Sequence, residues 1–128
     1  MESMGDKLDY LMKTQAAQEE KYNIIEREHG HRVPEWPIDV NNRHDAQFLK
    51  DGVYRMIEEL SEATNCLRNR PHTVTEYLTD EQHFLEEMAD ATHYFLRLFV
   101  MLGLSGDDIV KLYFMKSEVN QFRRDSNY

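Results

Sequence analysis

The scarcity of residues that interrupt helices constrains this chain more than any other feature. Of its 128 residues, three are proline and five are glycine. Pro34 and Pro37 flank Trp36, and Pro71 stands apart from them. Proline ends or kinks a helix because it lacks an amide proton and clashes with the preceding turn. Long helices can therefore form on either side of residues 31–42, which we expect to be an ordered loop or extended crossover.

Apolar residues recur at helical spacing in four segments, and no segment alternates apolar and polar residues as a strand would. The predicted helices span about residues 6–28, 45–69, 79–102 and 106–124. Their predicted inward residues are Leu8, Leu11, Ala16 or Ala17, Tyr22 and Ile25; Val53, Met56, Ile57, Leu60, Ala63 and Leu67; Phe84, Leu85, Met88, Ala91, Phe95, Leu98, Phe99 and Leu102; and Ile109, Leu112, Tyr113, Met115 and Val119. The pattern predicts an all-α fold, a bundle of about four helices in one domain spanning residues 1–128.

Local signals place the ends of these helices. Gly30 and Gly103 are expected to end the first and third helices, while Pro71 ends the second. Thr79, with a glutamine three residues later, forms a capping-box pattern at the start of the third helix. Ser105 is predicted to cap the fourth helix, where two following aspartates suit the positive end of the helix dipole.

Charge and cysteine usage limit the classes of partner. The formal net charge is −9, which argues against binding a nucleic-acid backbone but not against free nucleotides accompanied by metal ions. The single Cys66 cannot form an intramolecular disulfide and fits a reducing compartment. The first residues lack the apolar stretch of a signal peptide, and the run Tyr94–Leu104 is too short to span a bilayer. We expect a cytoplasmic protein with no nucleic-acid or membrane partner.

Two pairs of carboxylates lie beside the apolar stripes of the second and third helices. Glu59 and Glu62 are three residues apart, as are Glu87 and Asp90, so each pair projects from nearly one helix face. If the two helices pack antiparallel, the pairs can meet. Oxygen-only ligands favour Mg²⁺ or Mn²⁺, and such ions accept phosphate oxygens. The alternative is a pair of solvated acidic faces, and spacing alone supports the two interpretations equally.

The residues around these carboxylates resemble a known signature. The run Glu58-Glu59-Leu60-Ser61-Glu62, followed by Glu87-Met88-Ala89-Asp90, resembles the EExxE…ExxD motif of the all-α nucleoside triphosphate pyrophosphatases. That superfamily includes the MazG proteins, the dimeric dUTPases and the phage dCTP/dUTP pyrophosphatases. The run 90–95 (DATHYF) resembles the family's continuation of this motif. The resemblance is continuous from about Phe84 to Tyr128 and patchier before that.

The end of the chain strengthens the resemblance. Lys116, Asn120, Arg123, Asp125 and Tyr128 match a Lys-x3-Asn-x2-Arg-x-Asp-x2-Tyr ending of the dimeric dUTPases and phage dCTP pyrophosphatases. The first three share one helix face, where a cation, an amide and a guanidinium can bind phosphate oxygens. Without the resemblance, basic residues that complement the helix dipole are the favoured interpretation. With it, phosphate contact is favoured, and Tyr128 is expected to fold over a site.

The resemblance is weaker in the N-terminal half. Gln15 and Gln18 fall where dimeric dUTPases place a Gln and an Asn that read the pyrimidine, but the second position here is Gln. Those enzymes also carry a Trp- and Lys-rich stretch after the first carboxylate pair, where this chain has residues 67–71 (LRNRP). These departures leave the base preference open.

The resemblance implies hydrolysis of a nucleoside triphosphate between its α and β phosphates, which yields a nucleoside monophosphate and pyrophosphate. It implies Mg²⁺, with Mn²⁺ as the other candidate, held by the residues Glu59, Glu62, Glu87 and Asp90. Glu58 or a ligand carboxylate would orient the water. The favoured substrate is dUTP or dCTP; the alternatives are a MazG-like enzyme for a purine dNTP and a non-catalytic helical nucleotide-binding or interaction protein.

By the same resemblance, the bundle is MazG-like and completed by oligomerisation, as a homodimer or homotetramer whose sites use more than one chain. A phage-encoded protein acting in the host cytoplasm is one interpretation of its origin.

Three further residues could have functional or structural roles. Two interpretations are considered for His93 and for Trp36, and a structural one is favoured for Cys66. His93, one turn beyond Asp90, is either a partner of a ligand carboxylate or a core histidine. Trp36 is either a residue that stacks on a base or covers the pocket, or a hydrophobic plug, and the plug is favoured. Cys66 is interpreted as a packing residue, since a lone thiol adds no expected chemistry to an oxygen site.

Overall fold

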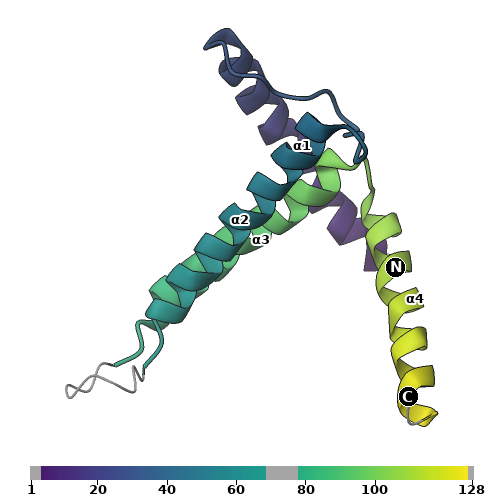
Figure 1. The fold of residues 1–128 in the computed structure, drawn as a ribbon. Coiled ribbons are helices and arrows are strands. Elements are labelled where there is room, and N and C mark those ends of the chain that lie inside the picture. Colours follow the sequence, from purple (N-terminus) through teal and green to yellow (C-terminus); the bar gives the residue numbers. More distant parts are fainter. Residues whose placement is uncertain (1–3, 69–77, 127–128) are drawn as a thin grey trace. The chain divides into compact units, whose positions relative to one another are not determined.

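The computed structural model describes residues 4–68 and 78–126, and within these ranges it contains four helices and no strand. They are α1 (Met4–Glu28), α2 (Arg43–Asn65), α3 (Glu81–Met101) and α4 (Gly106–Asp125), shown in Figure 1. The predicted all-α fold is confirmed. None of the described helices is both long enough and apolar enough to cross a membrane.

The start of α2 is set by a side-chain cap. Asn42 has an extended backbone, and its side-chain oxygen accepts hydrogen bonds from the amides of His44 and Asp45. These bonds satisfy two of the amides that a helix start leaves without partners, so α2 begins two residues before the predicted start. The helix ends at Asn65, where the amide of Cys66 donates to Ala63 O. The prediction of a helix to about residue 69 is therefore wrong, because the described residues 66–68 are not helical. Pro71, the predicted stop, lies outside the described residues.

The predicted cap of α3 is wrong by one residue. The amide of His83 donates to Asp80 Oδ1 at 3.1 Å, so Asp80 and not Thr79 caps the helix. Thr79 is engaged elsewhere, because its hydroxyl accepts a hydrogen bond from the amide of Arg68 at 2.8 Å. Gly103 follows the helix with a positive φ of 75°, as predicted for a helix end.

The predicted C-terminal end of α1 and the predicted start of α4 are confirmed. Gly30 follows α1 with a φ of 81°. Ser105 caps α4 in a complete capping box, in which its side chain accepts from the Asp108 amide while the Asp108 carboxylate accepts from the Ser105 amide. The pKa of Asp108 is lowered, mainly by the hydrogen bond from the Ser105 amide and next by the one with the Ser105 side chain.

The chain divides into two compact units, Met1–Pro37 with Phe99–Tyr128, and Ile38–Leu98. In the first unit α1 packs against α4. The amide of Gly106 donates to Asp9 Oδ1, and a Cβ at position 106 would lie 2.5 Å from the Asp9 nitrogen. Glycine is therefore required for this approach. The single domain predicted for the whole chain stays a prediction.

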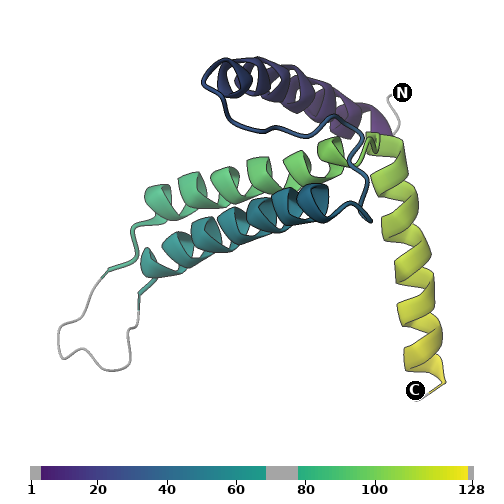
Figure 2. The same cartoon turned by 45° about the horizontal axis from the view of Figure 1, so that its top comes forward.

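The second unit is an antiparallel hairpin of α2 and α3, which run side by side in both views (Figures 1 and 2). Two hydrogen bonds close the hairpin where the helices end. The Asp80 amide donates to Cys66 O at 2.9 Å, and the Arg68 amide donates to the Thr79 hydroxyl. At another point along the pair, the Arg97 guanidinium of α3 lies 5.3 Å from the ring centre of Phe48 on α2. These contacts hold the two helices in one register.

The buried face of α1 differs from the predicted one. Met12, Gln15, Glu19 and Asn23 are buried, whereas the predicted inward residues Leu11, Tyr22 and Ile25 are exposed. The buried polar groups are partly satisfied within the helix, since Gln15 Nε2 donates to Glu19 Oε1 at 2.9 Å. Apolar periodicity cannot detect such a face because most of its residues are polar.

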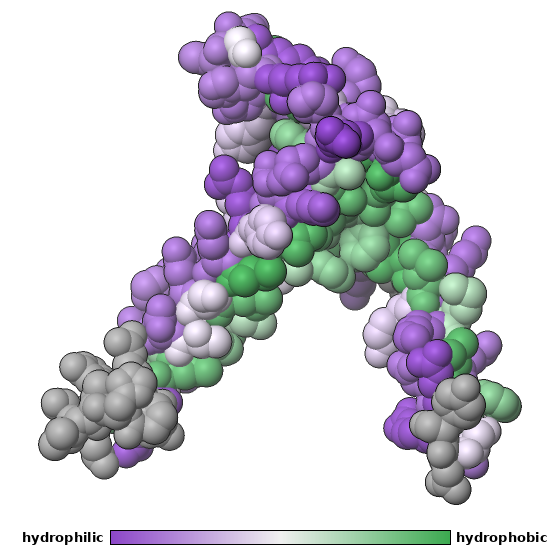
Figure 3. Space-filling view, viewed as in Figure 1, coloured by the Kyte–Doolittle hydropathy of each residue, from purple (hydrophilic) through white to green (hydrophobic). Residues whose placement is uncertain are grey.

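Many of the other predicted inward residues are also exposed. They are Ile57, Leu60 and Leu67 of the α2 segment, Leu85, Met88 and Phe95 of α3, and Leu112, Tyr113, Met115 and Val119 of α4. Figure 3 shows hydrophobic side chains along one side of the α2–α3 hairpin. A helix that packs against one neighbour covers only part of a broad apolar stripe. Part of each stripe is therefore left available to another surface.

Candidate metal centre

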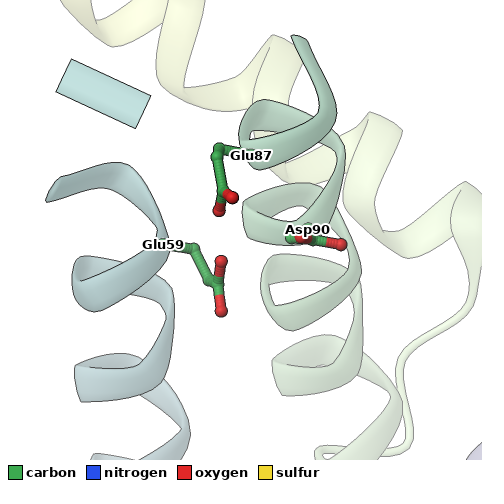
Figure 4. Close-up of side chains that lie close together, drawn as sticks. All are labelled: Glu59, Glu87 and Asp90. Carbon is green, nitrogen blue, oxygen red and sulfur yellow. The ribbon is translucent and has the colours of Figure 1, made fainter. Parts of the chain in front are cut away.

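Three carboxylates meet between α2 and α3. Glu59 comes from α2, and Glu87 and Asp90 come from adjacent turns of α3 (Figure 4). One oxygen of each residue lies within 4.8 Å of the corresponding oxygens of the other two. Figure 4 shows the Glu59 and Glu87 side chains facing the gap between the helices. The structure thus brings together three of the four carboxylates that the sequence predicts as metal ligands.

Small residues on the same helix faces explain this meeting. Ala63 lies one turn after Glu59, and Ala91 lies one turn after Glu87, and both alanines are buried. Residues four apart share a helix face, so each carboxylate projects from the face that packs against the other helix. Alanine at these positions allows the backbones to approach closely, which brings the carboxylates within reach of one another.

The fourth predicted ligand, Glu62, is exposed at the edge of this cluster. A hydrogen bond with Glu87 is the largest cause of a raised pKa at Glu62, followed by the charge of Glu87. Glu62 is therefore adjacent to Glu87, although it does not belong to the group of three. Glu58 is also exposed, and its charge adds to the rise in the pKa of Glu62.

The crowded negative charges change how the cluster holds protons. The pKa of Glu59 is raised to about 7. The largest cause is a hydrogen bond with Glu87, followed by desolvation and by the charges of Glu62, Glu87 and Asp90. The hydrogen bond with Glu59 is also the largest cause of a lowered pKa at Glu87. Like charges this close are not all ionised together, so the crowding favours a proton on Glu59 at a pH below about 7.

Glu87 is the most enclosed carboxylate of the cluster, with a side chain 12% exposed. Its Oε1 is 3.0 Å from His83 Nε2. Its Oε2 is buried without a hydrogen-bond partner among the described residues. A buried oxygen in this state is costly unless a proton or a cation satisfies it. The oxygen-only donor set and this unsatisfied oxygen fit a hard divalent cation such as Mg²⁺.

The other predicted site residues lie outside the α2–α3 hairpin. Gln15 is buried on α1 and Gln18 of the same helix is exposed. Lys116, Asn120 and Arg123 are exposed on α4. Tyr128 lies outside the described residues. The roles assigned to these residues stay predictions.

His83 is the residue near the carboxylates that sequence reasoning missed. It precedes Glu87 by four residues, the spacing that places two side chains on one helix face, and this signal was present in the sequence. Sequence reasoning considered His93 instead, which is exposed on α3. Cys66 donates to Glu62 O at 3.4 Å, and partial burial raises the pKa of its thiol, as expected for a packing residue.

Comparison with known proteins assigns the chain to a family. A family model described as dUTPase matches residues 39–128, which include both helices of the hairpin and all of α4. The chain belongs to this dUTPase family. The predicted membership of the all-α nucleoside triphosphate pyrophosphatases is therefore confirmed.

Two curated proteins are similar to a shorter stretch of the chain. Two proteins named dCTP pyrophosphatase, from Enterobacteria phage LZ5 and Enterobacteria phage T4, are each 37% identical over 49 residues. The stretch covers 38% of this chain, and 28% and 29% of the two relatives respectively. The match thus spans less than a third of the length of these relatives. No solved structure matches the chain significantly.

Proposed function

We propose that this protein is a divalent-metal-dependent diphosphatase that hydrolyses dUTP or dCTP to the nucleoside monophosphate and pyrophosphate. The observation that carries the proposal is the meeting of Glu59, Glu87 and Asp90 within the segment that matches the dUTPase family. The name of the family and the names of the phage relatives both designate enzymes of pyrimidine deoxynucleotides. This agreement supports a pyrimidine substrate.

The cluster supplies a place for the cation and for the water. Glu59, Glu87 and Asp90, with Glu62 beside them, would hold Mg²⁺ or Mn²⁺. A bound cation supplies positive charge that offsets the charge of the triphosphate and of the leaving pyrophosphate. Glu58 or a ligand carboxylate would orient the attacking water and accept its proton. The bond that breaks joins the α phosphorus to the oxygen bridging it to the β phosphorus.

The residues that would bind the rest of the substrate come from other helices. Lys116, Asn120 and Arg123 share one face of α4 at spacings of four and three residues, so a cation, an amide and a guanidinium could contact the phosphates together. Gln15 and Gln18 would read the base, and Tyr128 would close over the nucleotide. These assignments follow the family resemblance residue by residue.

The test is a panel of the four canonical dNTPs and dUTP, incubated with the protein and Mg²⁺, with identification of the products. The proposal predicts pyrophosphate and a monophosphate, with dUTP or dCTP turned over fastest. Release of single phosphate would contradict the cleavage position, and a purine preference would favour a MazG-like enzyme. Binding of nucleotides without turnover would indicate a non-catalytic protein.

A further inference from the structure

His83 has an environment that a surface histidine does not ordinarily have. Its Nε2 lies 3.0 Å from Oε1 of Glu87, and its side chain is 55% exposed while that of Glu87 is only 12% exposed. The imidazole therefore reaches from the surface to the most enclosed carboxylate of the cluster. It is a nitrogen donor to Oε1, whereas the other groups that contact Glu87, Glu59 and Glu62, are themselves carboxyls.

Asp80 holds His83 from the other side. The backbone amide of His83 donates to Asp80 Oδ1 at 3.1 Å, and His83 Nδ1 lies 4.0 Å from Asp80 Oδ2. The cap and the first two turns of α3 thus place Asp80, His83 and Glu87 in order along the helix. A ring with one nitrogen near each carboxylate has a preferred orientation, in which Nε2 donates to Glu87.

The two oxygens of Glu87 consequently have different surroundings. Oε1 is occupied by the His83 contact, whereas Oε2 is buried and has no hydrogen-bond partner among the described residues. We propose that His83 is a positioning residue that holds Glu87 by Oε1 and thereby presents Oε2 to the divalent cation. The inference rests on the proposed function, because it assumes that the cluster binds a metal. Groups that orient a ligand carboxylate commonly change metal affinity without touching the ion.

A neighbouring pair provides the comparison. Gln82 Nε2 and Glu86 Oε1 lie 3.5 Å apart at the same spacing of four residues on the same helix, but Glu86 is exposed and outside the cluster. A pair of this kind contributes only to helix stability. If the His83 contact were of the same kind, removing either pair would have the same consequence for metal binding.

The experiment is a calorimetric titration of the metal-free full chain, without nucleotide. Mg²⁺ and Mn²⁺ are titrated separately, and calorimetry gives the affinity for each ion. His83→Leu should weaken binding by about 10- to 100-fold, the range found when such partners are removed. His83→Gln should recover most of the affinity, because its amide can donate to Glu87 from a similar position. Gln82→Leu, the matched control, should bind as the unmodified protein does.

The outcomes separate the two proposals. If the unmodified protein binds neither ion, the proposed metal-dependent function fails and this inference fails with it. If it binds metal and His83→Leu binds equally well, the positioning role is overturned while the proposed function stands. Should His83→Leu fail to fold by circular dichroism, His83→Asn, whose amide is one methylene shorter, replaces it. Equal metal affinities of His83→Asn and His83→Gln would then overturn the inference.

Discussion

At the residue scale, Glu59 and Glu87 show how crowded carboxylates change one another's pKa. The hydrogen bond between them and the nearby charges raise the pKa of Glu59 to about 7, and the same bond lowers the pKa of Glu87. At a pH below about 7, a proton on Glu59 relieves repulsion that a bound cation would also relieve. A cation that binds the cluster must therefore displace this proton.

This proton predicts how metal-free stability depends on pH. Between the ordinary value of 4.5 and about 7, the folded chain keeps a proton on Glu59 that the unfolded chain releases. The free energy of unfolding should therefore fall as the pH rises through this window. The lowered pKa of Glu87 acts below 4.5, in the opposite direction and outside the window.

Thermal melts in the presence of a chelator measure this dependence. The melting midpoint should decline between about pH 5 and pH 7, and the decline should be smaller in Glu59→Gln, which has no proton to lose. A midpoint that does not decline, or that declines equally in the variant, would show that Glu59 titrates as an ordinary surface carboxylate.

Metal binding should show the complementary dependence. Because the cation competes with the proton on Glu59, we expect a fixed concentration of Mg²⁺ to raise the melting midpoint more at about pH 8 than at about pH 6. Calorimetry in buffers of different ionisation enthalpy should detect proton release near the lower pH. An equal rise at both pH values would be incompatible with displacement of a proton from the ligand set.

Removing one ligand charge should reduce turnover strongly while leaving the helices intact. Glu59→Gln and Asp90→Asn keep the shape of the side chain but remove its charge. We expect the turnover rate to fall by about two to three orders of magnitude, as is typical for loss of one group that stabilises transition-state charge. Glu86→Gln, next to Glu87 but outside the cluster, should retain activity. If the Asp90→Asn protein stays active, Asp90 is not a metal ligand that turnover requires.

At the element scale, the site depends on how closely α2 and α3 approach. Ala63 and Ala91 lie on the contact faces one turn from Glu59 and Glu87, and both are buried. The helices approach closely at these two alanines, so neither position has room for a larger side chain. A displacement of either helix would move the carboxylates apart. The same contact between α2 and α3 thus stabilises the hairpin and positions the carboxylates of the site.

Enlarging this contact tests that dependence. Ala91→Leu should destabilise the protein by about 1–3 kcal/mol, the usual cost of overpacking a core, and should also weaken Mg²⁺ binding. Ala89→Leu is the matched control, because Ala89 lies two residues away on the same helix and is exposed. Urea unfolding gives the stability change. An Ala91→Leu protein as stable as the control would show that the helices do not contact at this face.

At the scale of the whole molecule, much apolar surface stays exposed. Residues such as Leu85 of α3 and Tyr113 of α4 are 58% and 68% exposed, although their helical spacing is that of core positions. A monomer rarely keeps broad apolar patches in contact with water, and such patches commonly mark a protein interface. The exposed stripes support the predicted homodimer or homotetramer.

Light scattering coupled to size exclusion tests this prediction. We expect a mass of two or four chains, and we expect Leu85→Arg to shift the population towards one chain because it places a charge in the apolar stripe. Glu86→Arg, a control on the exposed side of the same turn, should leave the mass unchanged. A single-chain mass for the unmodified protein at micromolar concentration would contradict the prediction.

The sequence by itself determined the features that depend on neighbours along the chain. Four helices, the glycines that follow α1 and α3, the Ser105 capping box and the spacing of the two carboxylate pairs all arise within a few residues, where backbone geometry dictates the outcome. The family was also determined at this level, because its motif combines such local spacings.

Tertiary structure decided what depends on contacts between distant segments. Packing buries the polar face of α1. The Thr79 hydroxyl accepts a hydrogen bond from the Arg68 amide, and Asp80 caps α3 in its place. Packing also places Glu59 against Glu87, which creates the raised pKa. Apolar periodicity reports only which residues avoid water, whereas burial and pKa depend on which partner the packed helices bring near, and that partner lies far away in the chain.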